Sequence, residues 1–153
     1  MANFIVDNIS VVGMAAAVPK NKFKKDDFVK QFGEDATTKF IKSTGIKCIH
    51  RAGPKQTASD LAYEAANNLL HNIDVEKNKI GILVFVTQSP DYRRPATACV
   101  LQKRLELPVN CAALDVGLGC SSFVYGQQVL TSMLDNSNSE YGLLLLGETA
   151  SKL

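Results

Sequence analysis

The sequence lacks the features that would point to a membrane, a nucleic acid or a metal. Its longest apolar runs are far shorter than the roughly 20 residues of a membrane-spanning helix. Its net charge is only +2 and its charges are scattered, so we expect neither a nucleic-acid partner nor a membrane partner. The four cysteines have no metal-ligand spacing and no paired spacing. We therefore expect no metal, no disulfide framework and a reducing, cytoplasmic setting.

The beginning of the chain has no basic segment followed by an apolar stretch, so we expect no secretory signal. A length of 153 residues suits one domain, or half of a larger one. The hydrophobic content of 46% is ordinary for a globular protein. We therefore expect residues 1–153 to form a single domain with a packed core.

Strand signals and helix signals alternate along the chain. We expect strands over residues 9–18, 46–51, 80–86, 111–116 and 141–146, and helices over residues 24–32, 35–42, 57–73, 96–105 and 121–135. Residues 19–22 have the composition of a turn. The alternation predicts an α/β fold with a mixed, mainly parallel sheet and helices on both faces. In such sheets, ligands bind beyond the carboxyl ends of the strands.

Cys120 stands at one of these strand ends. An apolar run ends at Val116, Gly117 and Gly119 follow, and a helical pattern opens after Cys120. The two glycines permit backbone angles that other residues avoid. Free N–H groups and the helix dipole at a helix N-terminus favour negative charge, and therefore the reactive thiolate. This placement predicts acyl chemistry at Cys120.

A simpler interpretation remains open, because many free cysteines only fill small gaps in a core. Cys48, Cys99 and Cys111 are weaker candidates for a nucleophile: they lie in a short strand, a helix and an apolar run, respectively. Only Cys120 has glycines before it and a helix after it.

With these motifs in place, the chain resembles the N-terminal half of a β-ketoacyl-acyl-carrier-protein synthase III, a member of the thiolase superfamily. The strongest match is Leu114–Val116 followed by Cys120–Phe123. Supporting matches, all in the family's order, are Thr44–Ile46, Thr57–Ala66, Ile80–Val84 with Thr87, Pro95–Ala98 with Gln102, and Leu146–Lys152. The resemblance covers nearly the whole chain and implies a thiolase-like fold.

The resemblance implies a mechanism for the whole enzyme. Cys120 would take an acyl group from acyl-coenzyme A or an acyl carrier protein, and the acyl thioester would be condensed with a malonyl-carrier-protein type substrate. Such an enzyme would be a homodimer acting in fatty acid or related acyl biosynthesis, with these thioesters as substrates and no tightly bound cofactor. Two alternatives remain: an acyltransferase of secondary-metabolite or polysaccharide biosynthesis that uses a carrier-protein donor, and a non-catalytic thiolase-fold partner subunit.

The chain departs from the family's pattern at several places. The family's catalytic His and Asn belong to the C-terminal half, and neither His50 nor His71 falls in that motif. We therefore expect a truncated piece of a longer protein that is itself inactive in condensation, with both histidines in structural or surface roles. Lys39 and Ser43 stand where many members have a Trp and an Arg that hold coenzyme A, and the chain contains no Trp.

Arg94 stands where many members have a Phe that enters the partner's acyl pocket. An unpaired charge in an apolar pocket is costly. Arg94 must therefore turn to solvent or pair with a polar group of the substrate or the neighbouring subunit. Together with the changes at Lys39 and Ser43, this favours a carrier-protein donor or a polar acyl group over plain acetyl-coenzyme A.

Overall fold

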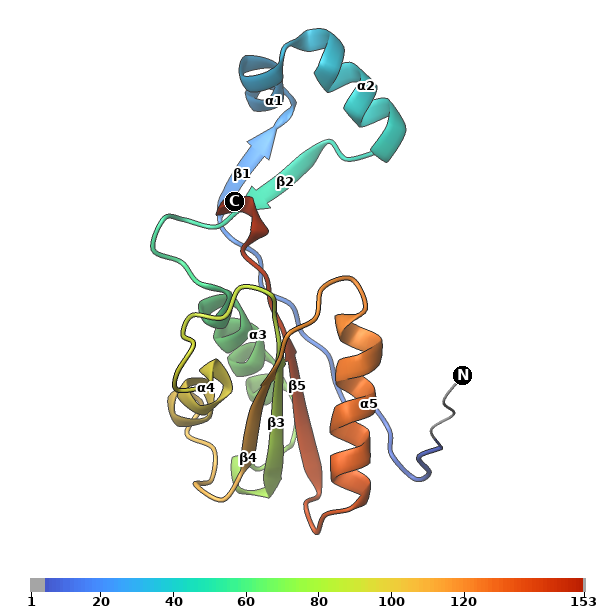
Figure 1. The fold of residues 1–153 in the computed structure, drawn as a ribbon, viewed down its shortest axis with the longest axis vertical. Helices are drawn as coiled ribbons and strands as arrows, with labels where there is room; N and C mark the ends of the chain where they lie inside the picture. The colour runs from blue at the N-terminus through green and yellow to red at the C-terminus, as the bar shows by residue number, and fades with distance from the viewer. Residues whose placement is uncertain (1–4, 153) are drawn as a thin grey trace. The chain divides into compact units, whose positions relative to one another are not determined.

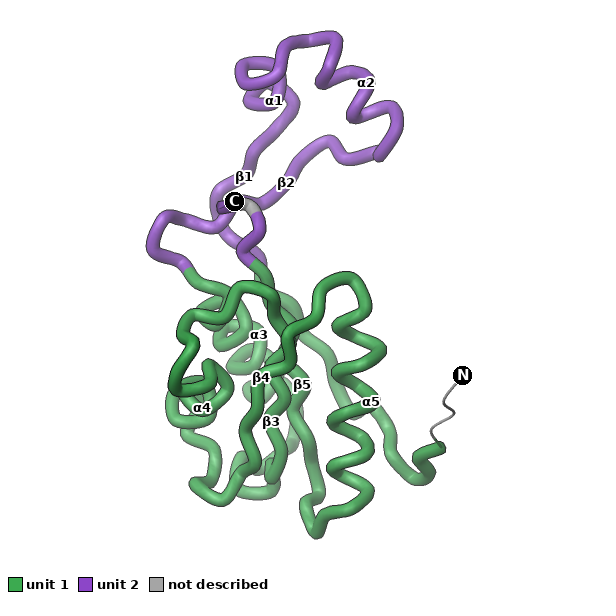
Figure 2. The backbone as a smooth tube through the Cα atoms, viewed as in Figure 1, with its two compact units in different colours: residues 1–17, 57–148 green, residues 18–56, 149–153 purple. Residues whose placement is uncertain are grey.

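The computed structural model describes residues 5–152 (Figure 1). They form two units (Figure 2). The first unit consists of residues 5–17 and 57–148, and the second consists of residues 18–56 and 149–152.

The first unit is built on a three-stranded parallel sheet. Its strands, in the spatial order β4-β3-β5, are β4 (Ala112–Val116), β3 (Ile80–Val86) and β5 (Tyr141–Leu146). In the register, Val84 lies between Leu114 and Leu144. Nearly all of the central strand β3 is buried, because helices cover both of its faces. The strand predicted from the apolar run at residues 80–86 is therefore confirmed.

Three helices cover the sheet, α3 and α4 on one face and α5 on the other (Figure 1). They are α3 (Ala58–Asn72), α4 (Thr97–Arg104) and α5 (Ser122–Asp135), and a short 3-10 turn, η1 (Lys77–Lys79), precedes β3. Thr57 caps α3, because its hydroxyl accepts a hydrogen bond from the Asp60 N–H (3.2 Å). The α/β class with helices on both faces is confirmed.

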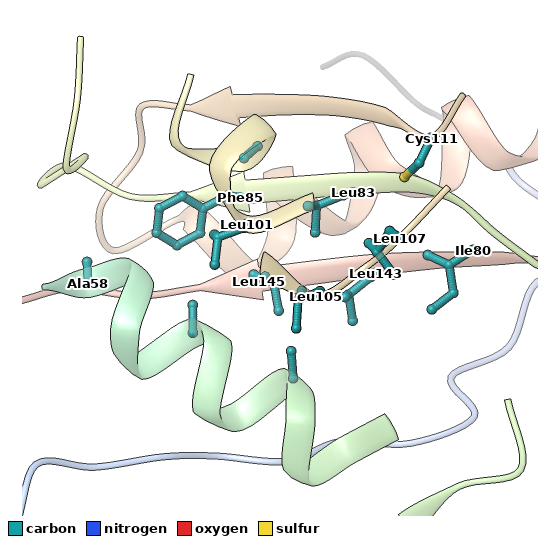
Figure 3. Packing of buried hydrophobic residues seen from close by; sticks show 13 residues of the cluster. Ala58, Ile80, Leu83, Phe85, Leu101, Leu105, Leu107, Cys111, Leu143 and Leu145 are labelled. Atoms are coloured by element: carbon teal, nitrogen blue, oxygen red, sulfur yellow. The ribbon is translucent and has the colours of Figure 1, made fainter. Parts of the chain in front are cut away.

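The two faces of β3 belong to two separate apolar clusters, because successive side chains of a strand point to opposite sides. Leu83 and Phe85 pack against α3 and α4, and Figure 3 shows these side chains meeting between the helices and the sheet. The members of this cluster are Ala58, Ala62, Ala66, Ile80, Leu83, Phe85, Ala98, Leu101, Leu105, Leu107, Cys111, Leu143 and Leu145. The second cluster joins Ile82, Val84, Val86 and Leu130 of α5.

Helix α5 lies very close to the sheet at Gly126. A Cβ atom at that position would lie 2.7 Å from Val86 Cγ2, so a side chain there would push the helix away. Gly126 and Leu130, four residues apart on one side of the helix, are buried. Phe123 is not, since 50% of it is exposed, and Val124 and Tyr125 beside it are exposed as well. The first turn of α5 therefore presents apolar surface to solvent.

The second unit pairs two helices with an antiparallel ribbon. Its elements are β1 (Asn21–Lys24), α1 (Lys25–Phe32), α2 (Glu34–Thr44), β2 (Cys48–Arg51) and the 3-10 turn η2 (Ala150–Lys152). Gly45 ends α2 in the left-handed conformation, at φ 73°, which glycine adopts readily. Phe28 holds the small core together: its ring centroid lies 4.8 Å from that of Phe23 and 5.6 Å from that of Phe40.

Two sequence-based expectations are wrong: the strand over residues 9–18 and the turn over residues 19–22. Residues 9–18 form no strand, and several of their large side chains are exposed: Val11, Val12, Met14 and Val18. An apolar run becomes a strand only where a neighbouring strand supplies hydrogen bonds. None of the described strands pairs with residues 9–18. Residues 19–22 are not a simple turn, because β1 begins at Asn21.

Charge is unevenly distributed between the two units. Residues 18–56 contain ten Lys or Arg and four Asp or Glu, whereas residues 57–148 contain six and ten, respectively. The expectation of scattered charge is therefore wrong, and positive charge is concentrated in the second unit. The argument against an anionic partner does not apply to that unit. Within residues 5–152, no helix is both long enough and apolar enough to cross a membrane.

Candidate active site

Cys120 lies in the tight turn that connects β4 to α5. Strand β4 ends at Val116 and α5 begins at Ser122. The Ser122 N–H donates to the Gly119 carbonyl oxygen (2.9 Å), so this hydrogen bond closes the turn around Cys120. The Cys120 side chain is exposed. The arrangement predicted from the sequence, a cysteine between a strand end and a helix N-terminus, is confirmed.

The first turn of α5 offers backbone N–H groups near Cys120. The four N-terminal N–H groups of a helix have no partner within the helix itself. Within the described residues, the Ser121 side chain makes no capping hydrogen bond at this end. One of these groups, the Ser122 N–H, already donates to Gly119, and the others can donate to an oxyanion bound at the turn.

The structure gives Gly119 a reason other than the one expected, and it gives none for Gly117. Among the glycines of residues 5–152, only Gly33 and Gly45 have positive φ, so Gly117 and Gly119 do not use glycine's special backbone angles. Gly119 instead allows a close approach. A Cβ atom there would lie 2.5 Å from Gln88 Oε1 and 2.9 Å from Gln88 Cδ. The Gln88 carboxamide therefore lies directly against the residue that precedes Cys120.

The carboxyl ends of the three strands meet at this edge of the sheet. The Thr87 N–H donates to the Val116 carbonyl oxygen (3.0 Å), and the Gly147 N–H donates to the Val86 carbonyl oxygen (3.3 Å). Directly beyond β5, the Glu148 carboxylate accepts hydrogen bonds from the Gln88 N–H, the Ser89 hydroxyl (2.8 Å) and the Thr87 hydroxyl (3.4 Å). These polar groups and the Cys120 turn form the candidate active site.

A carboxylate on β4 fixes the beginning of α4. Asp115 accepts hydrogen bonds from the backbone N–H groups of Thr97 (2.6 Å) and Ala98 (2.7 Å). Negative charge at a helix N-terminus is favourable, so Asp115 ties α4 to the strand that leads to Cys120. At the other end of α4, the Gln102 amide nitrogen donates to the carbonyl oxygens of Pro108 (2.7 Å) and Cys111 (3.1 Å).

Comparison with known proteins identifies the family. No family model matches the chain. A β-ketoacyl-[acyl-carrier-protein] synthase III from Clostridium botulinum is 32% identical over 149 residues, which cover 97% of this chain and 44% of the relative. A crystal structure of a 3-oxoacyl-(acyl-carrier-protein) synthase III matches with a TM-score of 0.88 at 35% identity, over 94% of this chain and 42% of that one. The chain belongs to the synthase III-like proteins of the thiolase superfamily.

A more distant solved structure supports the same fold. A variant of OleA from Xanthomonas campestris matches with a TM-score of 0.83 at 26% identity, over 97% of this chain and 47% of that protein. The chain thus spans less than half the length of the synthase III proteins and the OleA structure that it matches. It corresponds to their N-terminal part.

In this synthase III-like chain, Arg94 lies on the loop between β3 and α4 and is exposed. Whether its charge pairs with a substrate or with the neighbouring subunit stays a prediction. The loop itself is anchored at Asp91, whose carboxylate accepts hydrogen bonds from the Ser59 hydroxyl (2.5 Å) and, more weakly, from the Ser59 N–H (3.4 Å). Arg104 completes the anchor by donating to the Ser59 hydroxyl (3.1 Å) and to Asp60 (3.0 Å).

Asp60 has a perturbed pKa at this anchor. Burial alone would raise the pKa of the carboxyl, but hydrogen bonds from Thr57 and Arg104 outweigh burial and hold the pKa below its ordinary value of 3.8. The Arg104 guanidinium also lies over the Tyr63 ring, 4.5 Å from its centroid. Asp60 is therefore a structural carboxylate that stays ionised near neutral pH.

The other predicted substrate-binding residues, Lys39 and Ser43, lie on α2 in the second unit, whereas Cys120 and Arg94 belong to the first unit. Lys39 is exposed, and the Ser43 hydroxyl donates to the Phe40 carbonyl oxygen (3.0 Å). Their role towards coenzyme A stays a prediction. The structure places both residues in the unit that contains the excess of basic residues.

The remaining cysteines differ from Cys120 in position. Cys111 is buried, and burial raises the pKa of its thiol, which keeps it protonated. Cys48 and Cys99 are exposed rather than packed, but they lie within a strand and a helix and not at a strand-to-helix turn. Exposure therefore does not single out Cys120; its place at the strand end does.

The two histidines occupy the structural and surface positions that we expected. A ring nitrogen of His50 lies 2.5 Å from the Pro19 carbonyl oxygen, and His71 is exposed near the end of α3. Sequence reasoning did not assign roles to Gln88, Ser89 and Asp91. A signal was present, since these polar residues follow the buried strand β3 within a few positions, where α/β sheets bind ligands.

Proposed function

We propose that this chain is the nucleophile-bearing part of an acyltransferase of the synthase III type, in which Cys120 carries the acyl group as a thioester. The observation that carries the proposal is the exposed Cys120 at the N-terminus of α5, beyond the carboxyl end of β4. The synthase III names of the relatives support the same chemistry. The activity of the whole enzyme is likewise proposed, because the chain spans less than half the length of those relatives.

The first step is transfer of the acyl group to the protein. The Cys120 sulfur forms a bond to the carbonyl carbon of the donor thioester, and the bond between that carbon and the donor sulfur breaks. The proton of the Cys120 thiol ends on the departing donor thiol. Backbone N–H groups at a helix N-terminus stabilise both the thiolate and the negative oxygen of the tetrahedral intermediate. Covalent catalysis of this kind predicts ping-pong kinetics.

The second step condenses the acyl group with a malonyl-carrier-protein type substrate. Loss of carbon dioxide leaves a carbanion that attacks the Cys120 thioester and forms a carbon–carbon bond. The bond between the thioester carbon and the Cys120 sulfur breaks, and the released thiolate takes a proton from solvent. In the synthase III family this step uses a His and an Asn. Neither His50 nor His71 occupies that motif, so condensation needs groups that residues 1–153 do not supply. The proposed whole enzyme is a homodimer acting in fatty acid or related acyl biosynthesis.

Charge supports an anionic donor. Residues 18–56 have six more basic than acidic residues, and they include Lys39, the position that we assign to the donor. Coenzyme A and the prosthetic arm of a carrier protein both carry phosphate, which a basic surface attracts. Lys39 offers no aromatic face for adenine, and Arg94 places an exposed charge on the loop assigned to acyl recognition. Both changes favour a carrier-protein donor or a polar acyl group over acetyl-coenzyme A.

Mass spectrometry after mixing the chain with a panel of acyl-coenzyme A and acyl-carrier-protein donors tests the proposal. We expect one acyl group, located on the peptide that contains Cys120, and its loss in Cys120→Ala. Cys99→Ala is the matched control, since Cys99 is also exposed and lies on a neighbouring helix. Acylation that avoids Cys120, or none from any donor, would overturn the proposal and favour a non-catalytic partner subunit.

The donor preference needs a second measurement. If Arg94 disfavours a plain acetyl group, Arg94→Phe should raise the rate of Cys120 acylation by acetyl-coenzyme A relative to the carrier-protein donor. Arg93→Phe is the control, because Arg93 is the exposed neighbour on the same loop. The donor assignment is wrong if acetyl-coenzyme A already acylates Cys120 fastest and Arg94→Phe leaves the preference unchanged.

A further inference from the structure

Glu148 binds the segment that follows β3 through both of its carboxylate oxygens. One oxygen accepts hydrogen bonds from the Gln88 N–H and the Thr87 hydroxyl (3.4 Å), and the other accepts from the Ser89 hydroxyl (2.8 Å). The Ser89 N–H also donates to the Thr87 hydroxyl (3.0 Å), which folds the segment into a compact turn. One side chain thus holds three consecutive residues.

These contacts are not needed to pair the strands. Strands β3 and β5 are joined by their own ladder up to Val86 and Leu146, and the Gly147 N–H extends it to the Val86 carbonyl oxygen. Glu148 acts beyond the point where the ladder stops. It is an exposed carboxylate that would otherwise be fully hydrated, yet it makes several charge-assisted hydrogen bonds to one short segment. Its effect is therefore to fix the position of that segment.

The segment held by Glu148 reaches the Cys120 turn through Gln88. Glu148 holds the backbone of Gln88, and the carboxamide of Gln88 lies against Gly119. Gly119 in turn accepts the Ser122 hydrogen bond that closes the turn around Cys120. A continuous set of contacts therefore runs from a carboxylate just beyond β5 to the nucleophile that follows β4.

We propose that Glu148 and Gln88 are positioning residues for Cys120: Glu148 locks the Thr87–Ser89 turn, and the Gln88 carboxamide then fixes the Gly119–Ser122 turn. This inference rests on the proposed function, in which Cys120 is the acylated nucleophile. Neither residue takes or gives a proton in the reaction. Each acts through the geometry of the turn, which must be held to within a fraction of an ångström for efficient attack.

The test compares Glu148→Gln and Gln88→Ala with the wild-type chain. A carboxamide keeps one acceptor oxygen and presents an NH₂ in place of the other, so Glu148→Gln weakens the clamp with little change in shape. We expect the saturating rate of Cys120 acylation to fall about tenfold in both variants, the effect of losing about one hydrogen bond to a charged group. The donor concentration at half-saturation should stay unchanged, because neither residue binds the donor.

Glu140→Gln is the matched control. Glu140 precedes β5, at the opposite end of the strand from Glu148, and makes an exposed ion pair with Lys79 (3.2 Å). This variant should acylate at the wild-type rate. Hydrogen exchange of the Ser122 amide provides a readout independent of chemistry. Its exchange should be faster in Glu148→Gln and Gln88→Ala than in Glu140→Gln, while exchange in β3 stays unchanged.

The outcomes separate the two proposals. Wild-type rates and wild-type Ser122 exchange in both variants would refute the positioning role. If wild-type Cys120 accepts no acyl group from any donor, the proposed function fails, and Ser122 exchange together with iodoacetamide alkylation of Cys120 decides the positioning role. If Glu148→Gln does not fold, Gln88→Ala decides it, because the Gln88 side chain contacts the turn directly.

Discussion

Asp115→Ala should destabilise the chain strongly. The carboxylate accepts hydrogen bonds from the N–H groups of Thr97 (2.6 Å) and Ala98 (2.7 Å), and both of these residues are 0% exposed. Water therefore replaces the carboxylate poorly. A hydrogen bond to a charged group contributes roughly 1.5–3 kcal/mol, and negative charge at a helix N-terminus adds roughly 0.3–1 kcal/mol. The free energy of unfolding should fall by about 4 kcal/mol in total.

Urea and thermal unfolding followed by circular dichroism measure this change. A loss of about 4 kcal/mol corresponds to a fall in Tm of about 8–16 °C for a chain of this size. Asp115→Asn keeps one acceptor oxygen, so its loss should be about half as large. Asp135→Ala is the control, because Asp135 is an exposed residue at the end of α5, and its effect should stay within about 0.5 kcal/mol.

The reasoning would be refuted if Asp115→Ala were as stable as Asp135→Ala. That result would mean that the two N–H groups find other partners, or that the strand carrying Asp115 does not hold α4. If Asp115→Ala and Asp115→Asn lowered the free energy of unfolding equally, the stabilisation would come from the charge of Asp115 and not from the number of its hydrogen bonds.

Three further predictions concern acid stability, condensation and association. Hydrogen bonds outweigh burial and lower the pKa of Asp60. The stabilising effect of the ionised carboxylate is therefore present above pH 3.8 and is lost as the pH falls through the lower folded pKa. In urea unfolding, wild type should lose more stability than Asp60→Asn between about pH 4 and pH 2. The purified 153-residue chain should release no β-ketoacyl product from acyl and malonyl thioesters, and such a product in a mass spectrum would disprove this. Because Phe123, Val124 and Tyr125 are exposed on α5, the chain should self-associate; light scattering should give a mass that rises with concentration, less so in Val124→Lys, and a monomer mass throughout would contradict it.

Local sequence signals were sufficient to predict most of the helices and strands of the first unit. The apolar run of β3 predicts a strand covered on both faces, because only a fully buried strand avoids polar residues on both sides. Thr57 and Gly45 mark helix ends through groups that act within a few residues of the chain. Cys120 was placed at a strand-to-helix turn for the same reason, since the strand, the turn and the helix are consecutive in sequence.

Pairings between distant residues were decided only by the tertiary structure. The apolar segment at residues 9–18 has the composition of a strand, yet no described strand supplies its hydrogen bonds. The β1–β2 ribbon joins segments more than twenty residues apart, and nothing in the short run Asn21–Lys24 specifies its partner. Phe123 has the helical spacing of a core residue, but it lies beyond the part of α5 that the sheet covers.

In the candidate site, too, some features were determined by the sequence and others only by the tertiary structure. The sequence by itself determined that Cys120 follows a strand and precedes a helix, and it suggested an incorrect reason for the glycines, because it contains no information on what approaches Gly119. Only the folded chain brings Gln88 against Gly119 and Glu148 against Gln88, across 60 residues of sequence. Parallel strands pair through long crossovers, so the groups that meet at their carboxyl ends are distant in the chain and are selected by the packing of the sheet.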